Sequence, residues 1–250
     1  MGVNTVIQIA FSWISAAGAV YYDPLKILCC TRISLRLGRI FYNKLSQIYN
    51  TYRLEQIRHA YQNNSVAQQS PDNQLIKVVF FPDEKLLCKK LIDGGSCEDD
   101  RCNFGHNDTA LSVVTRHLSS ATRTIDICVF MISSQELADV ILRIHQSGVV
   151  IRVVVDCEKM DLNCSQIEQF RADGIQVRHD KTSYFMHHKF CIIDRHVLIN
   201  GSFNWTRQAI TGNRENLMIC DIPDIVRPYQ EEFERLWKVY NPEADQKTMP

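Results

Sequence analysis

The sequence predicts a layered α/β domain in which helices cover both faces of a β-sheet. Strand-like and helix-like segments alternate from Leu75 to Tyr240, and the helix-like ones repeat apolar residues every three or four positions. Apolar residues make up 45% of the 250, enough for a substantial buried core. The formal net charge of zero neither requires nor excludes a polyanionic partner.

The order of the elements follows from these periodicities. One helix is expected to begin at Ser134, a good N-cap, and to close with Gly148, and another ends at Gly174. The segment 149–156 is β-branched on both faces, which indicates a buried strand. Strands are predicted at residues 75–81, 124–131, 149–156, 175–180, 189–194 and 215–221, and helices at 109–121, 134–148, 165–174 and 224–240.

The N-terminal segment predicts a membrane anchor over residues 1–24. Residues 3–22 contain no charged side chain, and a helix of that length spans about 30 Å, the thickness of a bilayer core. A cleaved signal peptide and a buried core helix are the alternatives. Seven Lys or Arg residues against the single Glu55 follow between positions 26 and 58, which predicts a cytosolic body. A weakly apolar anchor with a basic flank is typical of the mitochondrial outer membrane.

Residues 25–74 are interpreted as a basic amphipathic helix, clearest over residues 40–63, followed by a polar linker. Ten cysteines in a body that faces the cytosol are expected to be mostly reduced thiols. Cys29 and Cys30 are either palmitoylation sites or unmodified juxtamembrane residues. The last ten residues, 241–250, form a tail.

A small insertion at residues 88–106 carries three cysteines and a histidine with the spacing C-x8-C-x4-C-x3-H. Thiolates and imidazole are zinc ligands, and a polar, Gly-rich segment without its own core gains shape from a structural metal. The alternative is a set of unrelated cysteines and a surface histidine. The spacing resembles CCCH zinc fingers, many of which bind single-stranded RNA, so Phe104 is either a base-stacking platform or a packing residue. The predicted zinc ligands are Cys88, Cys97, Cys102 and His106.

A cluster of polar side chains surrounds the strand predicted at residues 189–194. Because side chains two apart share a face of a strand, His187 and Lys189 project together and His188 points the opposite way. Histidine is a nucleophile toward phosphorus, and lysine with the nearby Asn204 would neutralise phosphate oxygens. The segment has no acidic cluster for Mg²⁺, which favours a phosphodiester chemistry without a catalytic metal.

The pattern H-x-K-x4-D-x6-G-S-x-N, formed by His187, Lys189, Asp194, Gly201, Ser202 and Asn204, resembles the HKD motif of the phospholipase D superfamily. The resemblance covers roughly residues 75–240, the expected catalytic domain, and implies a mixed sheet. It also implies a phosphohistidine formed by His187, phosphate contacts from Lys189 and Asn204, and support from Ser202. Glu215, eleven residues beyond Asn204, would orient a histidine. Asp194 either ties the loop or touches phosphate.

The family mechanism needs two histidines, and the chain carries one motif. His179, His188 and His196 lack the lysine and GS-x-N context. A homodimer that joins two copies of the motif on a twofold axis would supply the pair. Its interface is expected on the sheet edge that carries residues 186–216.

The anchor, the single motif and the zinc insertion together resemble the mitochondrial branch of this superfamily. That resemblance implies an endonuclease that cuts single-stranded RNA to leave 5′-phosphates, in the piRNA pathway of germ cells. A hydrolase that converts cardiolipin or another phospholipid to phosphatidic acid is the alternative, and a catalytically idle scaffold or RNA-binding module is the third. Groove width and charge would distinguish a nucleic-acid strand from acyl chains.

Overall fold

The computed structural model describes residues 34–65, 74–93, 95–156, 166–180 and 182–242. The chain packs as two units, residues 1–46 and 47–250, and the sheet with its polar motif belongs to the second. The predicted anchor at residues 1–24, Cys29 and Cys30 lie outside the described residues. Among the helices that are described, none combines the length and the apolar character that a membrane span requires.

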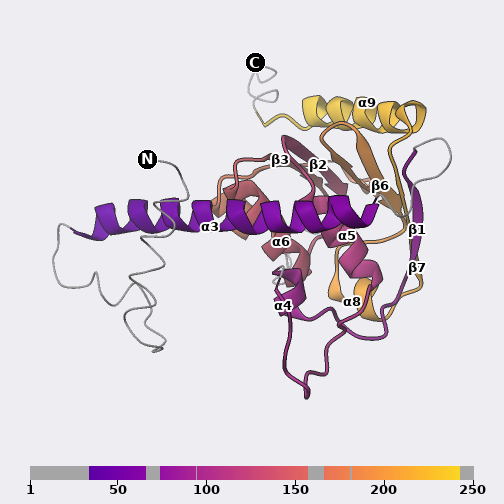
Figure 1. The fold of residues 1–250 in the computed structure, drawn as a ribbon. Coiled ribbons are helices and arrows are strands. Elements are labelled where there is room, and N and C mark those ends of the chain that lie inside the picture. Colours follow the sequence, from indigo (N-terminus) through magenta and orange to yellow (C-terminus); the bar gives the residue numbers. More distant parts are fainter. Residues whose placement is uncertain (1–33, 66–73, 94, 157–165, 181, 243–250) are drawn as a thin grey trace. The chain divides into compact units, whose positions relative to one another are not determined.

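A seven-stranded sheet forms the centre of this unit, with the strand order β1-β7-β6-β5-β2-β3-β4 (Figure 1). The pairs β2–β3 and β3–β4 are parallel and the other neighbours are antiparallel, so the sheet is mixed, as predicted. The strands are β1 (Ile76–Phe81), β2 (Thr124–Val129), β3 (Val150–Val155), β4 (Gln176–His179), β5 (Lys189–Ile193), β6 (Val197–Gly201) and β7 (Glu215–Cys220).

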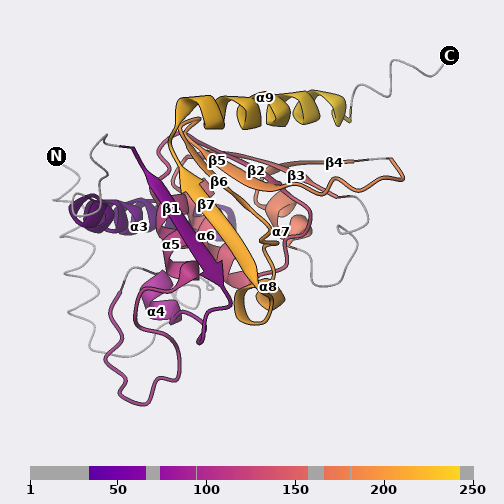
Figure 2. The same ribbon diagram turned by 90° about the vertical axis from the view of Figure 1, so that its right-hand side faces the viewer.

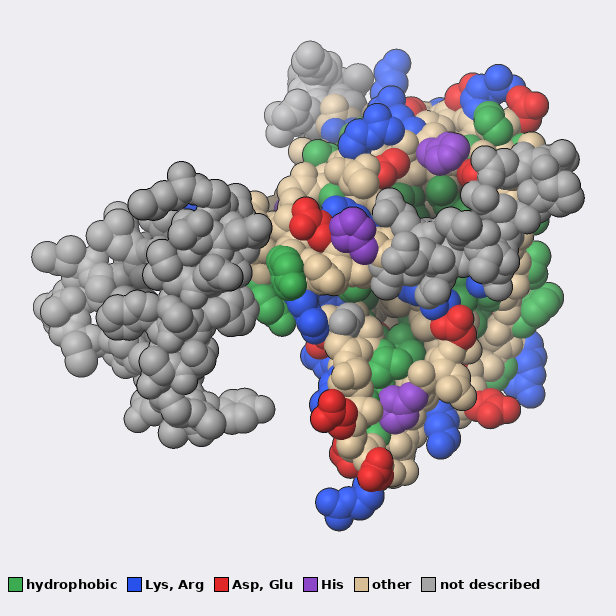
Figure 3. All heavy atoms as spheres, viewed as in Figure 1, with side chains coloured by type: hydrophobic (Ala, Val, Ile, Leu, Met, Phe, Trp, Pro, Cys, Tyr) green, Lys and Arg blue, Asp and Glu red, His purple; other side chains and the backbone are tan. Residues whose placement is uncertain are grey.

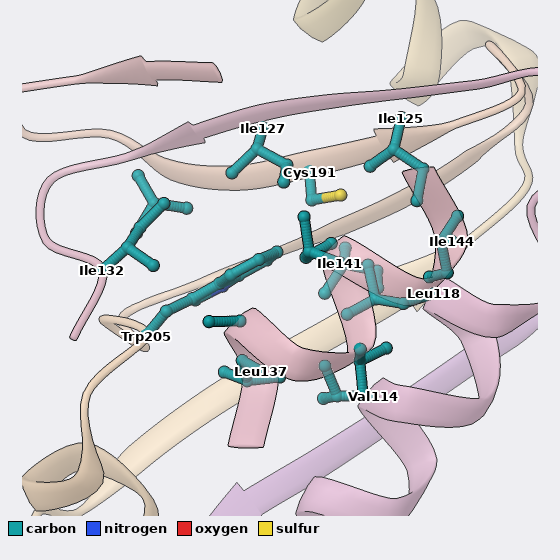
Figure 4. Close-up of a cluster of buried hydrophobic side chains, with 14 of the residues drawn as sticks. Val114, Leu118, Ile125, Ile127, Ile132, Leu137, Ile141, Ile144, Cys191 and Trp205 are labelled. Carbon is teal, nitrogen blue, oxygen red and sulfur yellow. The ribbon is translucent and has the colours of Figure 1, made fainter. Parts of the chain in front are cut away.

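Helices cover both faces of the sheet, as the sequence predicts. Figure 2 shows α9 on one face and α5, α6 and α7 on the other. Each face buries its own apolar cluster, and Figure 4 shows the larger one, on the side of α5 and α6. The described helices are α3 (Ser34–Ser65), α4 (Lys89–Ile92), α5 (Ala110–Ser119), α6 (Gln135–Gln146), α7 (Ile167–Ala172), α8 (Arg207–Thr211) and α9 (Pro223–Val239).

The part of α3 beyond residue 46 packs against the helical layer. Leu54 is buried there, Asn50 donates a hydrogen bond to Gln146 of α6, and Arg58 donates to the carbonyls of Ser119 and Ala121. On the face of the molecule seen in Figure 3, acidic and basic side chains are interspersed. This mixture agrees with the formal net charge of zero.

Strand β6 and the short helices α4 and α8 are not predicted by the sequence patterns. Strand β6 pairs with β5 through a tight hairpin, in which Asp194 and Arg195 have positive φ angles of 53° and 58°. Such turns are usually signalled by Asn-Gly or Asp-Gly. An Asp-Arg pair lacks the glycine of that signature, so the sequence gives little indication of the strand after it.

The strand order determines where the polar motif lies. Strand β5 is in the middle of the sheet, paired with β2 and β6, while β1 and β4 are the edges. The start of β5 therefore lies beside the end of β2 and the end of β6, and the end of β6 lies beside the start of β7. The expectation that residues 186–216 form a sheet edge is wrong, because they include β5 and β6, which lie in the interior of the strand order. The place of a dimer interface stays a prediction.

A buried ion-pair network attaches α9 to the sheet. Arg152 of β3 donates to both carboxylate oxygens of Asp126 at 2.8 and 2.9 Å and to those of Glu234 at 3.1 and 2.7 Å. Its guanidinium also lies 4.9 Å from the ring centroid of Phe233. Asp126 is 1% exposed, and the Arg152 guanidinium is the cation that pairs with its carboxylate.

We expect Arg152→Leu to lower the free energy of unfolding by about 3–5 kcal/mol, because it leaves the Asp126 carboxylate buried without its cation. Chemical denaturation followed by circular dichroism measures the loss. Arg227→Leu is the matched control: it removes an exposed ion pair with Asp224 on the same helix and should cost less than about 1 kcal/mol. Equal losses in the two variants would contradict the role given to Arg152.

Candidate functional site

His187 and Lys189 lie together where β5 begins. The Lys189 Nζ is 3.3 Å from His187 Nδ1 and donates a hydrogen bond to the His187 carbonyl at 3.0 Å. Both side chains contact the ring of Phe130: the imidazole centroid at 4.7 Å and the Lys189 Nζ at 5.2 Å. Phe130 directly follows β2, so the pairing of β2 with β5 places an aromatic support beneath the two polar groups. His187 and Lys189 therefore project together, as the sequence predicts.

The surroundings of His187 favour its neutral form. Partial burial lowers the pKa of the imidazole, and the positive charges of Lys189 and His188 lower it further, while the Asp156 carboxylate opposes them. A neutral imidazole has a free lone pair and is the form that attacks phosphorus. The position beside Lys189 therefore suits the predicted role of His187 as a nucleophile, which stays a prediction.

His188 points to the opposite side of the sheet, as strand alternation predicts. Its Nε2 is 3.3 Å from Glu232 Oε1 of α9, and its ring packs edge-on against Phe190. Of the other histidines considered, His179 is on β4, separated from β5 by β2 and β3, and His196 is in the hairpin at the far end of β5. Neither is a neighbour of His187 within the described chain.

Ser202 and Glu215 are joined by a hydrogen bond next to the site. The Ser202 hydroxyl donates to Glu215 Oε2 and accepts from the backbone N–H of Asn216 at 3.2 Å. The other Glu215 oxygen accepts from Asn213 at 2.9 Å. Burial lowers the pKa of Lys189, and the Glu215 charge opposes that shift. Within the described part of one chain, Glu215 bonds to Ser202 and Asn213, so its orienting of a histidine stays a prediction.

The structure shows why the motif has a glycine at position 201, and it shows the surroundings of Asn204. A Cβ at Gly201 would overlap the carbonyl of Asn216, so only glycine lets β6 approach β7 and brings Ser202 to Glu215. Asn204 is two residues beyond Ser202. The Oδ1 of its side chain is buried with no hydrogen-bonding partner among the described residues. A phosphate oxygen accepts hydrogen bonds, so the Nδ2 of this carboxamide, and not its Oδ1, is the group that could contact a bound phosphate.

Asp194 uses both carboxylate oxygens within the fold. They accept four hydrogen bonds of 2.7–2.9 Å, from the backbone N–H groups of Thr122, Arg123 and Thr124 and from the Thr122 hydroxyl. Burial raises the pKa of Asp194, but the bonds from Thr124, Thr122 and Arg123 outweigh it and hold the pKa below its usual value. Of the two alternatives, the contacts favour a structural tie between the β5–β6 turn and the start of β2.

We expect Asp194→Ala to lower the free energy of unfolding by about 1–3 kcal/mol, because it leaves several N–H donors without their acceptor. The fraction of protein that remains folded should keep a kcat within a few-fold of wild type. Asp173→Ala, at an exposed position after α7, is the control for a simple charge deletion. Unchanged stability together with abolished turnover would assign Asp194 to the phosphate instead.

Three further residues adjoin His187 although the sequence does not single them out. Asp156, at the end of β3, is 1% exposed and accepts a hydrogen bond from the Met186 N–H at 2.9 Å. Tyr184 and Phe185, just before the motif, are exposed aromatic residues. Only the position of Tyr184 and Phe185 next to the motif in the sequence could have indicated that they lie near the site. The role of Asp156 depends on strand order, which the sequence does not reveal.

The predicted metal ligands come together at the insertion between β1 and α5. One ligand atom from each of Cys88, Cys97, Cys102 and His106 lies within 4.8 Å of all the others. The Sγ atoms of Cys88 and Cys102 are 3.9 Å apart. Tetrahedral zinc with Zn–S bonds of about 2.3 Å places its ligands about 3.8 Å apart, so the residues fit this ion. A bound zinc would act structurally, by closing the loop.

Backbone hydrogen bonds hold the two ends of the insertion. The N–H of Cys88 donates to the Gly105 carbonyl at 3.0 Å, and the N–H of Gly105 donates to Leu86 at 2.7 Å. The six described cysteines are all free thiols. This agrees with the expectation of reduced cysteines for that part of the chain.

Protein purified under reducing conditions should contain one zinc per chain, and Cys97→Ser should lose most of it, because three ligands hold zinc more weakly than four. Elemental analysis of the dialysed protein measures both. Cys220→Ser, which changes a buried cysteine outside the cluster, should retain the metal. Wild-type protein free of zinc would refute the site.

Relatives in other organisms identify the family. The chain is 45% identical over 166 residues to a protein of Chlamydomonas reinhardtii named mitochondrial cardiolipin hydrolase, which covers 66% of this chain and 74% of the relative. A human protein of the same name is 44% identical over 172 residues, covering 66% and 68%. The chain belongs to the phospholipase D superfamily. It falls in the Zucchini-like group, the mitochondrial branch that the sequence resembles, and is a phosphodiester-cleaving enzyme.

Two further comparisons agree with this assignment. Residues 114–237 match the family described as cardiolipin synthase, PLD-like domain. The crystal structure of Nuc, a phospholipase D family member from Salmonella typhimurium, superposes with a TM-score of 0.52 at 19% identity. That superposition covers 66% of this chain and 95% of Nuc, and it supports the shared fold.

Proposed function

We propose that this phospholipase D superfamily enzyme is an endonuclease that cuts single-stranded RNA without a catalytic metal and leaves 5′-phosphates. The observation that carries the proposal is the pair formed by His187 and Lys189: a nucleophile kept neutral beside an ammonium group, at an exposed position at the strand ends. Such a pair combines attack on phosphorus with neutralisation of its oxygens.

The reaction proceeds in two displacements. The unprotonated ring nitrogen of His187 attacks the phosphorus, and the P–O3′ bond breaks. A second histidine gives its proton to the departing 3′-oxygen, then takes a proton from water, which attacks the phosphohistidine. The products are a 3′-hydroxyl and a 5′-phosphate, and His187 is restored. Lys189 and Asn204 hold the non-bridging oxygens throughout.

The second histidine is His187 of another copy of the chain. In the described residues, His188 faces α9 and His196 is at the far end of β5, so neither accompanies His187. A homodimer would join two sites at the strand ends, and Glu215 of each copy would then orient a histidine while it remains bonded to Ser202. The unit of activity is therefore the dimer.

The metal cluster and the N-terminus complete the proposal. The Cys88–His106 insertion, with zinc bound, positions RNA, and Phe104, 50% exposed, offers a ring to a base. Residues 1–24 anchor the protein in the mitochondrial outer membrane, with the body toward the cytosol. The 5′-phosphate ends fit a role in piRNA production in germ cells.

Hydrolysis of cardiolipin or a related phospholipid to phosphatidic acid is the second candidate. The relatives in Chlamydomonas reinhardtii and humans are named mitochondrial cardiolipin hydrolase, and the same phosphodiester chemistry serves a lipid head group. A membrane anchor would bring the site to such a substrate. The two functions differ in what must lie beside the phosphate, bases in one case and acyl chains in the other.

Protein that lacks residues 1–24 should cleave a single-stranded RNA oligonucleotide in EDTA, under conditions that retain zinc, and leave 5′-phosphates. His187→Asn should abolish turnover, by at least about a thousandfold, because it removes the nucleophile. His188→Ala is the matched control: the neighbouring imidazole faces α9, so its loss should change kcat only a few-fold. The rate of formation of labelled products measures the turnover of the wild type and of both variants, and analysis of the product ends identifies the 5′-phosphates.

Parallel assays on cardiolipin vesicles decide between the candidates. Turnover of vesicles with no cleavage of RNA would establish the lipid reaction instead. A requirement for added divalent metal would contradict the histidine mechanism. If His188→Ala were as inactive as His187→Asn, the assignment of the two faces of β5 would be wrong.

A further inference from the structure

Two exposed aromatic side chains lie two and three positions before His187 in the chain. Tyr184 is 83% exposed and Phe185 is 57% exposed. The Phe185 ring lies edge-on to Phe130 with centroids 5.5 Å apart, and Phe130 in turn contacts the His187 imidazole at 4.7 Å. A continuous series of rings thus leads from the reacting group to the surface. Folding gains little from the parts of these rings that remain open to solvent, so those faces are available to a ligand.

The backbone that carries these rings is fixed at both ends by buried carboxylates. Asp180, 3% exposed, accepts from the Thr182 N–H at 2.8 Å and from its hydroxyl at 2.9 Å. The Thr182 hydroxyl also accepts from the Tyr184 N–H at 3.2 Å. At the other end, Asp156 accepts from the Met186 N–H at 2.9 Å. The rings are therefore presented from an ordered turn, which lowers the entropy cost of binding a ligand.

The composition of the turn favours flat ligands over acyl chains. The described residues that flank the rings are polar and exposed, with Thr182 and Ser183 before them and His187 and His188 after the buried Met186. A loop that enters a membrane needs contiguous apolar area, whereas stacking needs only an exposed ring face beside a phosphate-binding cation. Lys189, 5.2 Å from the Phe130 centroid, provides that cation.

We propose that Tyr184 and Phe185 form a stacking platform for the unpaired bases next to the scissile phosphate. This inference rests on the proposed cleavage of RNA and assigns the residues that recognise a single strand. While His187 and Lys189 engage the phosphate, a neighbouring base lies on the Phe185 face and the next reaches Tyr184. Every base has a π-face, so the platform selects for single strands and not for a base sequence.

The test compares two oligoribonucleotides, one normal and one with abasic residues on both sides of the cleavage site. Phe185→Ala and Tyr184→Ala should each raise the KM for normal RNA about tenfold, with little change for the abasic substrate. Phe185→Leu, which keeps apolar bulk without a flat face, should behave like alanine, and Phe185→Tyr should restore most of the affinity. Tyr52→Ala, an exposed tyrosine on α3, is the control.

The other possible roles of these rings give different results. Equal losses on both substrates would overturn the platform, as would dissociation of the dimer in sedimentation, which would place the rings in the interface. Lost binding to cardiolipin vesicles with an unchanged KM for RNA would assign them to the membrane.

Fluorescence anisotropy with the same oligonucleotides separates this inference from the proposed function. RNA that is bound through the rings but never cleaved would contradict the proposed function alone. RNA that is cleaved equally well without the rings would contradict the platform alone.

Discussion

The antiparallel pairing of β5 with β2 and β6 is the constraint on which the site depends. Along β5 the side chains alternate, so that Cys191 and Ile193 enter the larger core while Phe190 and Ile192 enter the one beneath α9. The same alternation directs Lys189 to His187 and His188 to α9. A slip of one residue would exchange the two faces and separate His187 and Lys189 from the other residues of the motif.

Buried or bonded carboxylates hold that register at both ends of the strand. Asp194 binds the residues that lead into β2 beyond one end of β5, and Asp156 holds the Met186 N–H before the other. Such paired acceptors are costly to leave unmatched, so each favours a single alignment of the strand. The HKD aspartate thereby supports the chemistry from a distance, by fixing the strand that begins at His187 and Lys189. These contacts explain why a motif spread over a hairpin acts as one unit.

Local patterns predict the elements and the motif, whereas contacts between distant segments require the structure. Strand alternation is enough to predict that His187 and Lys189 share a face and that His188 points away from them. Ligand spacing is enough to predict that Cys88, Cys97, Cys102 and His106 come together. The hairpin at Asp194 and Arg195 is hard to predict because no glycine marks its positive φ angles. Phe130 and Asp156 belong to other strands, and only the strand order places them beside the site. That order also shows that residues 186–216 do not form an edge of the sheet.

We propose that one chain holds half of an active site, and mixed dimers test this most directly. Wild-type and His187→Asn chains, differently tagged and reassociated in known ratios, should give activity that falls as the square of the wild-type fraction. Equal mixing should then leave about one quarter of the activity, because only dimers with two wild-type chains are complete. A linear fall to about one half would mean that each chain carries its own complete site. His179, on β4, would then be the first candidate for the proton donor.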